Sequence, residues 1–314
     1  MRRFILKSLV LALFFTIVLG AFNFFIGLKL LRSIDYGGAQ EIQYCVLGHS
    51  HPECAFNDSL IDGMKNFALS GEAYFYNYYK VKSMLLHGVK LNNVFIEYSN
   101  NSLSTDVCEW IWDDQNLSRS YVKFSPFMDL RDNAFIFAHN PSGWLNSYCL
   151  SMKWRMDQLF KSRVNYLDYS GGYKYLDRSD MDSLLRTSDG NQNRMENTTM
   201  EVCDMNIFYL KELIQLLESN HSKVFLIRSP LHKVYPGFKY EPAYDSIYQQ
   251  HFSHVERLDF SRFPLNDDDF GDLEHLNYKG AKKFSLAFND MLSNGLLSSS
   301  VKQNFIDAYI ESMQ

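Results

Sequence analysis

The stretch QYCVLGHSHPECAFND, residues 43–58, joins a short apolar run to a group of reactive side chains. Residues 45–47 are typical of the end of a buried strand, and the glycine that follows them interrupts that strand. His49, Ser50 and His51 come directly after it. Two chemistries are therefore open. The histidines could be metal ligands in an H-x-H arrangement, or the serine could be a nucleophile whose histidine comes from elsewhere in the chain.

Along the chain from this stretch, apolar runs alternate with amphipathic helical patterns. Strands are predicted at residues 42–48, 67–71, 93–99, 223–230 and 255–260, and helices at 72–88, 200–220 and 277–295. This alternation predicts an α/β domain of three layers, in which a parallel sheet is flanked by helices on both faces. Residues 100–200, which contain all four tryptophans, fit neither pattern and are interpreted as an insertion.

The first residues of the chain differ from the rest. Residues 8–28 are long and apolar enough to cross the hydrocarbon core of a bilayer as a transmembrane helix. Basic side chains precede them, so the positive-inside rule places the N-terminus in the cytoplasm and the following domain outside it, in the periplasm or at the cell surface. The sequence thus predicts a membrane anchor at residues 1–31 and an extracytoplasmic domain at residues 32–314. A signal peptide cleaved near residues 18–20 is the alternative.

The composition is that of a folded protein without a basic surface for nucleic acid. Hydrophobic residues make up 46% of the chain and aromatic residues 16%, which is enough for a sizeable core. The net charge is −5 and the sequence has no long basic run, which argues against nucleic acid as a partner. The five cysteines are too few for a disulfide scaffold, although one or two bridges could form in an oxidising compartment.

A second reactive motif, DLEH, stands near the other end of the chain at residues 272–275. An aspartate three residues before a histidine can share one short loop with it and hold its imidazole in one tautomer. The other ring nitrogen can then take the proton of a serine hydroxyl. Active sites of parallel sheets lie at the carboxyl ends of the strands. Ser50, Asp272 and His275 are therefore predicted to meet there as nucleophile, orienting acid and base.

With these motifs the chain resembles the SGNH (GDSL-type) hydrolase superfamily. The GHS tripeptide that ends at Ser50 matches the first block of the family, although a histidine stands where the family usually has aspartate. Gly71 fits the second block, Asn100 or Asn101 the third, and DLEH the last. The resemblance implies a flavodoxin-like fold without a cofactor or metal. It also implies an oxyanion hole formed by the backbone N–H groups of Ser50 and Gly71 with one asparagine amide.

Within the superfamily the layout is most similar to membrane-anchored cell-envelope proteins, such as the alginate O-acetylation proteins and the D-alanyl-lipoteichoic acid transfer protein. The resemblance implies acyl transfer or ester hydrolysis, with O-acetyl groups on a cell-envelope polysaccharide as the substrate. Its implied partners are the bilayer, a membrane-bound acyl donor protein and a glycan acceptor. The alternatives are a non-catalytic assembly or binding protein that keeps the fold, and a metal-dependent hydrolase that uses His49 and His51.

Five further side chains are candidates for substrate binding. Trp110 and Trp112 could stack on sugar rings near the nucleophile, with core packing as the alternative. Arg228 and His232 could line the pocket, with ordinary loop polarity as the alternative. His51 could shape the loop that carries the nucleophile.

Overall fold

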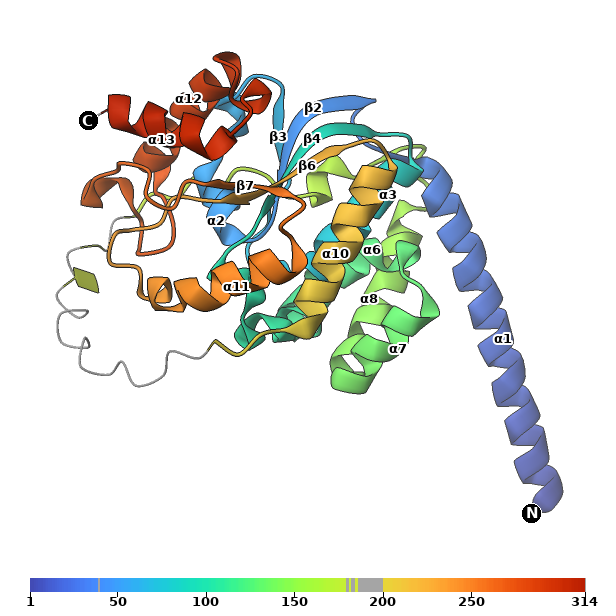
Figure 1. Ribbon diagram of the computed structural model, residues 1–314. Coiled ribbons are helices and arrows are strands. Elements are labelled where there is room, and N and C mark those ends of the chain that lie inside the picture. Colours follow the sequence, from blue (N-terminus) through green and yellow to red (C-terminus); the bar gives the residue numbers. More distant parts are fainter. Residues whose placement is uncertain (39, 179–180, 182–183, 186–199, 314) are drawn as a thin grey trace. The chain divides into compact units, whose positions relative to one another are not determined.

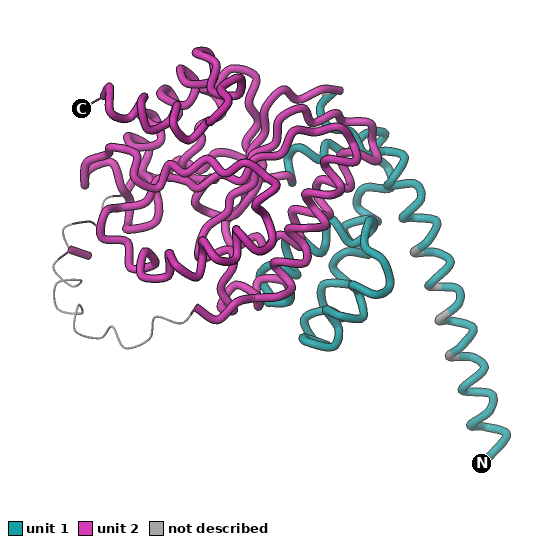
Figure 2. The backbone as a smooth tube through the Cα atoms, viewed as in Figure 1, with its two compact units in different colours: residues 1–38, 112–169 teal, residues 39–111, 170–314 magenta. Residues whose placement is uncertain are grey.

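The computed structural model describes residues 1–38, 40–178, 181, 184–185 and 200–313, apart from the side chains of residues 12, 16, 19 and 23. These residues form two compact units, which are coloured separately in Figure 2. The helical unit comprises residues 1–38 and 112–169, and the sheet unit comprises residues 39–111 and 170–314. Residues 100–200, interpreted from the sequence as one insertion, are thus divided between the two units. Positions 186–199 of that segment lie outside the described residues.

The sheet unit is built on a parallel sheet of the strands β2, β3, β4, β6 and β7 (Figure 1). Their bounds are Glu41–Leu47, Met64–Asn66, Lys90–Glu97, Lys223–Arg228 and Glu256–Asp259. The order across the sheet is β3-β2-β4-β6-β7, and every neighbouring pair is parallel. This confirms the predicted α/β class, and the order is the flavodoxin-like one. From β2 the chain adds β3 on one side of the sheet and then β4 on the other side, so the strand order switches between β2 and β4. The loops after these two strands are therefore the expected place for a site.

Helices cover both faces of this sheet. On one face Val46, Phe95 and Phe225 are neighbours in register, and they pack in one cluster with Phe284 and Phe288 of α12. The opposite face is covered by α3 and α10, which contact each other (Figure 1). The longer helices of the unit are α3 Tyr74–Leu86, α10 Asp204–Ser219, α11 Glu241–His251, α12 Tyr278–Ser293 and α13 Lys302–Ser312. Its short elements are α2 Ser50–Ala55, η1 Asp58–Leu60, α4 Asn100–Leu103, η2 Thr105–Ile111, η7 Pro236–Tyr240, η8 Asp267–Asp269 and η9 Leu296–Ser298.

The second strand lies earlier in the chain than the sequence indicated. β3 comprises residues 64–66, whereas the apolar pattern favoured residues 67–71. Residues 67–71 form a loop instead, because the hydrogen bonds of their backbone lie outside the regular ladder of the sheet. The Asn66 side chain accepts a hydrogen bond from one N–H of this loop, and the N–H of Leu69 donates to the carbonyl of Gly48 over 3.1 Å. The loop is thereby fastened to the turn that follows β2.

The helical unit contains α1 (Arg2–Ser33), α7 (Leu130–His139) and α8 (Pro141–Gln158). α1 is long and apolar enough to cross a membrane, in agreement with the predicted anchor. The end of α1 differs from its start, since Ile26 and Leu30 are buried and α1 contacts α8. The shorter elements are β1 Ile34–Asp35 paired in parallel with β5 Val164–Asn165, α5 Asp114–Asn116, η3 Leu117–Tyr121, α6 Val122–Phe124, η4 Ser125–Phe127 and η5 Leu167–Tyr169.

Candidate active site

Ser50 is the first residue of α2, directly after the turn that ends β2. Gly48 makes this turn with a φ of +146°, a conformation that side chains other than glycine rarely adopt. A Cβ atom at Gly48 would lie 2.6 Å from the Cβ of Glu97 and 3.0 Å from the Cγ of Pro52. His49 caps the helix, since its side chain accepts the N–H of His51. The sequence around Ser50 therefore fixes a tight turn that presents the hydroxyl at the carboxyl edge of the sheet.

The structure brings Ser50 together with the DLEH motif. The Oγ of Ser50 lies 2.7 Å from the Nε2 of His275. The Nδ1 of His275 lies 2.8 Å from Oδ1 and 3.0 Å from Oδ2 of Asp272. Since Nδ1 faces a carboxylate, it carries the proton, and Nε2 is free to accept the proton of the serine. This is the arrangement of nucleophile, base and orienting acid that the two motifs predict.

Asp272 is held as a carboxylate. Burial alone would raise the pKa of Asp272, but hydrogen bonds from His275, from the Glu274 N–H and from Arg178 hold this pKa well below its usual range. The N–H of His275 also donates to its Oδ1 over 2.9 Å. A carboxylate with so many donors stays in one orientation, and it stabilises the imidazolium that forms when His275 takes a proton.

The three predicted oxyanion residues have different surroundings. Gly71 stands in the loop after β3 with a φ of +70°, and this loop is fastened to the nucleophile turn. The amide of Asn100 donates to the carbonyl of Gly237 over 2.5 Å. The amide of Asn101 donates to Glu274 over 2.8 Å and lies 3.4 Å from the Nε2 of His51. Asn101 is thus the asparagine that contacts the residue next to the nucleophile, and its amide would have to turn from Glu274 to bind an oxyanion.

Two of the predicted pocket residues are buried and have ion-pair partners away from Ser50. Arg228 is 1% exposed, and its guanidinium pairs with Glu241 over 2.6 Å and with Asp259 over 3.5 Å. His232 is also 1% exposed, and its Nε2 lies 3.1 Å from Asp267. The sequence predicts that both side chains line the substrate pocket, with ordinary loop polarity as the alternative, and their partners come from later segments of the chain. Neither contacts Ser50 or its two partners.

The two predicted sugar-binding tryptophans belong to different units. Trp110 lies in the sheet unit, where its ring meets the ring of His49 edge-on at 6.0 Å between centroids. Trp112 lies in the helical unit, where its ring stacks on His139 at 4.2 Å. Trp110 therefore contacts the nucleophile loop, whereas the contacts of Trp112 are with α7.

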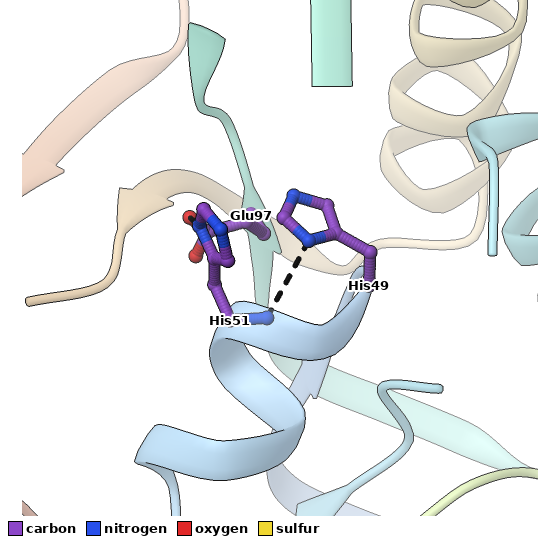
Figure 3. Close-up of side chains that lie close together, drawn as sticks. All are labelled: His49, His51 and Glu97. Atoms are coloured by element: carbon purple, nitrogen blue, oxygen red, sulfur yellow. Dashed lines mark hydrogen bonds and ion pairs between the residues drawn. The ribbon is translucent and has the colours of Figure 1, made fainter. Parts of the chain in front are cut away.

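His49, His51 and Glu97 gather beside the nucleophile, and Figure 3 shows their side chains. One ligand atom of each lies within 4.8 Å of the others, so the hypothesis that His49 and His51 bind a metal ion can be tested against this geometry. The Nδ1 of His49 accepts the His51 N–H, and its Nε2 lies 3.1 Å and 2.9 Å from the hydroxyls of Ser99 and Ser102. Zinc bound at about 2.0 Å from each ligand needs ligand atoms roughly 3.3 Å apart. The Nδ1 of His51 and the Oε1 of Glu97 are 3.7 Å apart, and both nitrogens of His49 already have hydrogen-bond partners, so these contacts favour a structural network over a metal centre.

Sequence reasoning missed several groups that complete the site. Arg178 holds the outer oxygen of Asp272, and it comes from a segment without any motif. Glu97 and Glu274 flank His51 at 3.7 Å and 3.4 Å. Glu274 lies inside DLEH, and Glu97 is a charged residue at the end of an apolar strand. A carboxylate in such a buried position needs a partner, and that signal could have found Glu97.

Comparisons with known proteins add little to this geometry. A protein-family model matches residues 172–297, less than half of the chain. A search of curated proteins found no significant match.

Two solved structures are similar. One is a candidate acylhydrolase from Bacteroides fragilis NCTC 9343, with 10% identity, a TM-score of 0.35, and coverage of 84% of this chain and 91% of that one. The other is a GDSL-like lipase from Bacteroides thetaiotaomicron VPI-5482, with 10% identity, a TM-score of 0.35, and coverage of 81% and 89%. Likenesses at this level carry no argument about chemistry, which rests on the geometry around Ser50.

Proposed function

We propose that the protein is an SGNH-type serine esterase or O-acyltransferase. The observation that carries the proposal is the continuous hydrogen-bonded series from the Ser50 hydroxyl through His275 to Asp272. In the reaction His275 takes the proton of Ser50 while the oxygen attacks the ester carbonyl. The tetrahedral intermediate then expels the alcohol, which leaves with the proton held by His275. Water or a second alcohol attacks the acyl-serine in the same way and releases the acyl group.

The finer part of the proposal is that the acceptor is a hydroxyl group of a cell-envelope glycan and that the acyl group is acetyl. A polar pocket of about 250 Å³ adjoins Asn101 and Tyr235, and Ser104, Asp106 and Glu201 also line it. Hydroxyls, amides and carboxylates suit a neutral hydroxylated ligand, and the described residues that line the pocket include no lysine or arginine to attract an anion. A membrane-bound protein would supply the acyl group.

The proposed location is the outer side of the cytoplasmic membrane, with α1 as the anchor. Cys108 and Cys203 form a disulfide within the sheet unit, which supports an oxidising compartment. The apolar start of α1 and its basic first residues support the orientation. A reporter that is active only in the periplasm, fused after residue 314, should be active. Activity of a cytoplasm-only reporter at that position would contradict the location.

The activity is tested by trapping the nucleophile in the full chain. A fluorophosphonate should label Ser50, identified by peptide mapping, and the Ser50→Ala and His275→Ala variants should lose labelling almost completely. Ser59→Ala is the matched control, because Ser59 is an exposed serine in the next short helix. Labelling at another serine, or intact labelling of Ser50→Ala, would exclude Ser50 as the nucleophile. No labelling of the wild type would favour the non-catalytic binding protein.

A further inference from the structure

His51 is a buried imidazole placed between two carboxylates of different origin. It is 1% exposed, and it follows the nucleophile directly in the chain. Its Nδ1 lies 3.7 Å from the Oε1 of Glu97 at the end of β4. Its Nε2 lies 3.4 Å from the Oε2 of Glu274, which stands between the two DLEH residues of the triad. The imidazole therefore lies between a core strand and the catalytic loop.

Both carboxylates are fixed by other donors, so neither can simply turn away from the imidazole. Glu97 accepts the N–H of Ser229 over 3.2 Å and its hydroxyl over 2.6 Å. Glu274 accepts the amide of Asn101, whose Oδ1 in turn accepts the hydroxyl of Tyr235 over 2.7 Å. A neutral imidazole has only one N–H and would leave one of the two carboxylates facing a lone pair. A doubly protonated ring directs one N–H at Glu274, at hydrogen-bond distance, and the other toward Glu97, at ion-pair distance.

The remaining charged groups around His51 are consistent with this charge state. Burial alone would lower the pKa of His51, but Glu274 and Glu97 raise it to about 9. His49, whose ring centroid is 4.4 Å away, is neutral because burial and the nearby imidazoles lower its pKa well below the ordinary range. The ring of His275 lies 5.3 Å away, with Asp272 and Arg178 behind it.

We propose that His51 is a positioning residue for the serine reaction, held as an imidazolium that ties the catalytic loop to β4 and places a positive charge beside the ring of His275. The inference rests on the proposed function, since it assigns a role in that reaction. His275 can act as a base only while it is neutral. The positive charge of His51 and the negative charge of Glu274 both lie close to the triad, and they act on a neighbouring charge in opposite senses.

The two charges predict opposite effects in a pH profile. His51→Gln removes the positive charge, so the acidic limb of kcat/KM should move to higher pH by on the order of one pH unit. Glu274→Gln removes the negative charge, so this limb should move to lower pH, because the Glu97 carboxylate remains 3.7 Å from the Nδ1 of His51 and still favours its positive charge. Glu241→Gln is the matched control, since Glu241 partners the buried Arg228 and contacts no member of the triad. A role that is only structural would lower the rate without moving the limb in opposite directions.

The experiment measures 4-nitrophenyl acetate hydrolysis by the full chain in detergent from pH 5 to 9. We expect the acidic limb to move to higher pH in His51→Gln, to lower pH in Glu274→Gln, and not at all in Glu241→Gln. All variants should be labelled by the fluorophosphonate at Ser50. If the acidic limb moves in the same direction in both variants, or does not move, the inference is overturned. Labelling at Ser50 would still support the proposed function. A wild type that is not labelled at Ser50 overturns both.

A second measurement observes the charge of the ring directly and does not depend on enzymatic activity. Nitrogen-15 NMR of the histidine rings in the wild type should show one ring protonated at both nitrogens at pH 8. Its signals should be absent from the spectrum of His51→Asn, or of His51→Gln if only that variant folds. If every ring is neutral at pH 8, the imidazolium does not exist and the inference is overturned, whatever the activity.

Discussion

Gly48→Ala tests how tightly the backbone of the nucleophile turn is constrained. The new methyl group would meet the Cβ of Glu97 at 2.6 Å, which is closer than real Cβ contacts allow, and the Cγ of Pro52 at 3.0 Å, which is a tight contact. A Cβ contact cannot be relieved by turning a side chain, so β4 or the turn itself must shift. The shift would displace Glu97 from His51 and Ser50 from His275. The substitution therefore perturbs stability and reactivity together.

The expected magnitude follows from two contributions. A residue other than glycine held in a rare backbone conformation costs about 1–3 kcal/mol. Overpacking of a filled interior adds about 1–3 kcal/mol, so the free energy of unfolding should fall by roughly 2–6 kcal/mol. Gly88→Ala is the control, because Gly88 also has a positive φ, +78°, but an added Cβ there meets nothing within 4 Å. It should lose only about 1 kcal/mol, the strain being partly offset by a less flexible unfolded chain.

The assay is urea unfolding of the full chain in detergent, followed by circular dichroism, with the fluorophosphonate labelling rate as a second readout. Gly48→Ala should have the lower midpoint and should label at least about tenfold more slowly, which corresponds to about 1.4 kcal/mol in the barrier. Gly88→Ala should label at the wild-type rate. Equal midpoints for the two variants would refute the reasoning, because they would show that contact with Glu97 costs nothing beyond the backbone strain.

Titration of His51 should make the stability of the sheet unit depend on pH. Its pKa rises from the ordinary 6.5 to about 9 on folding, so its contribution of roughly 3 kcal/mol is complete below pH 6.5 and is lost as the pH rises through 9. Urea midpoints at pH 6.5 and 9.5 measure this, and a His51→Gln variant with the same loss would contradict it. Replacing both cysteines of the Cys108–Cys203 bridge, which are 95 residues apart, by serine should lower the free energy of unfolding by about 2–5 kcal/mol. An unchanged midpoint for that double variant would mean that the bridge does not form. Strong chelators should leave the labelling of Ser50 intact, and labelling restored only by added zinc would support the metal-dependent hydrolase.

The parallel sheet and the triad could be predicted because their signals are local. Each strand is a short apolar run, and DLEH places an acid and a base on one loop, so only the meeting of two chain ends had to be inferred. The strand-end rule for parallel sheets supplied that inference. Arg178 could not be found in this way. It reaches Asp272 from a segment whose sequence has neither periodicity nor motif.

The helical unit escaped prediction for a different reason. α8 buries a row at intervals of four residues that consists of Gly143, Ser147, Ser151 and Arg155, with no large apolar side chain among them. Its contacts are hydrogen bonds, such as those of the Ser125 hydroxyl with Ser151 and Arg155. A search for hydrophobic periodicity cannot recognise a helix whose buried face is small and polar. The ion pairs of Arg228 could not be predicted either, because its partners Glu241 and Asp259 lie in later segments of the chain.

The way in which α1 ends determines how the helical unit is mounted on a bilayer. Large apolar side chains are exposed from Phe4 to Phe25, and at about 1.5 Å per residue this length spans about 33 Å, close to the thickness of the hydrocarbon core. The helix continues without a break through Ile26 and Leu30, which are already packed in the helical unit. No flexible linker therefore separates a membrane-embedded α1 from the unit that it enters. A helical unit mounted in this way cannot sweep a volume as a unit on a flexible tether does. It would stay at a fixed height above the lipid surface, set by the point at which α1 leaves the hydrocarbon core.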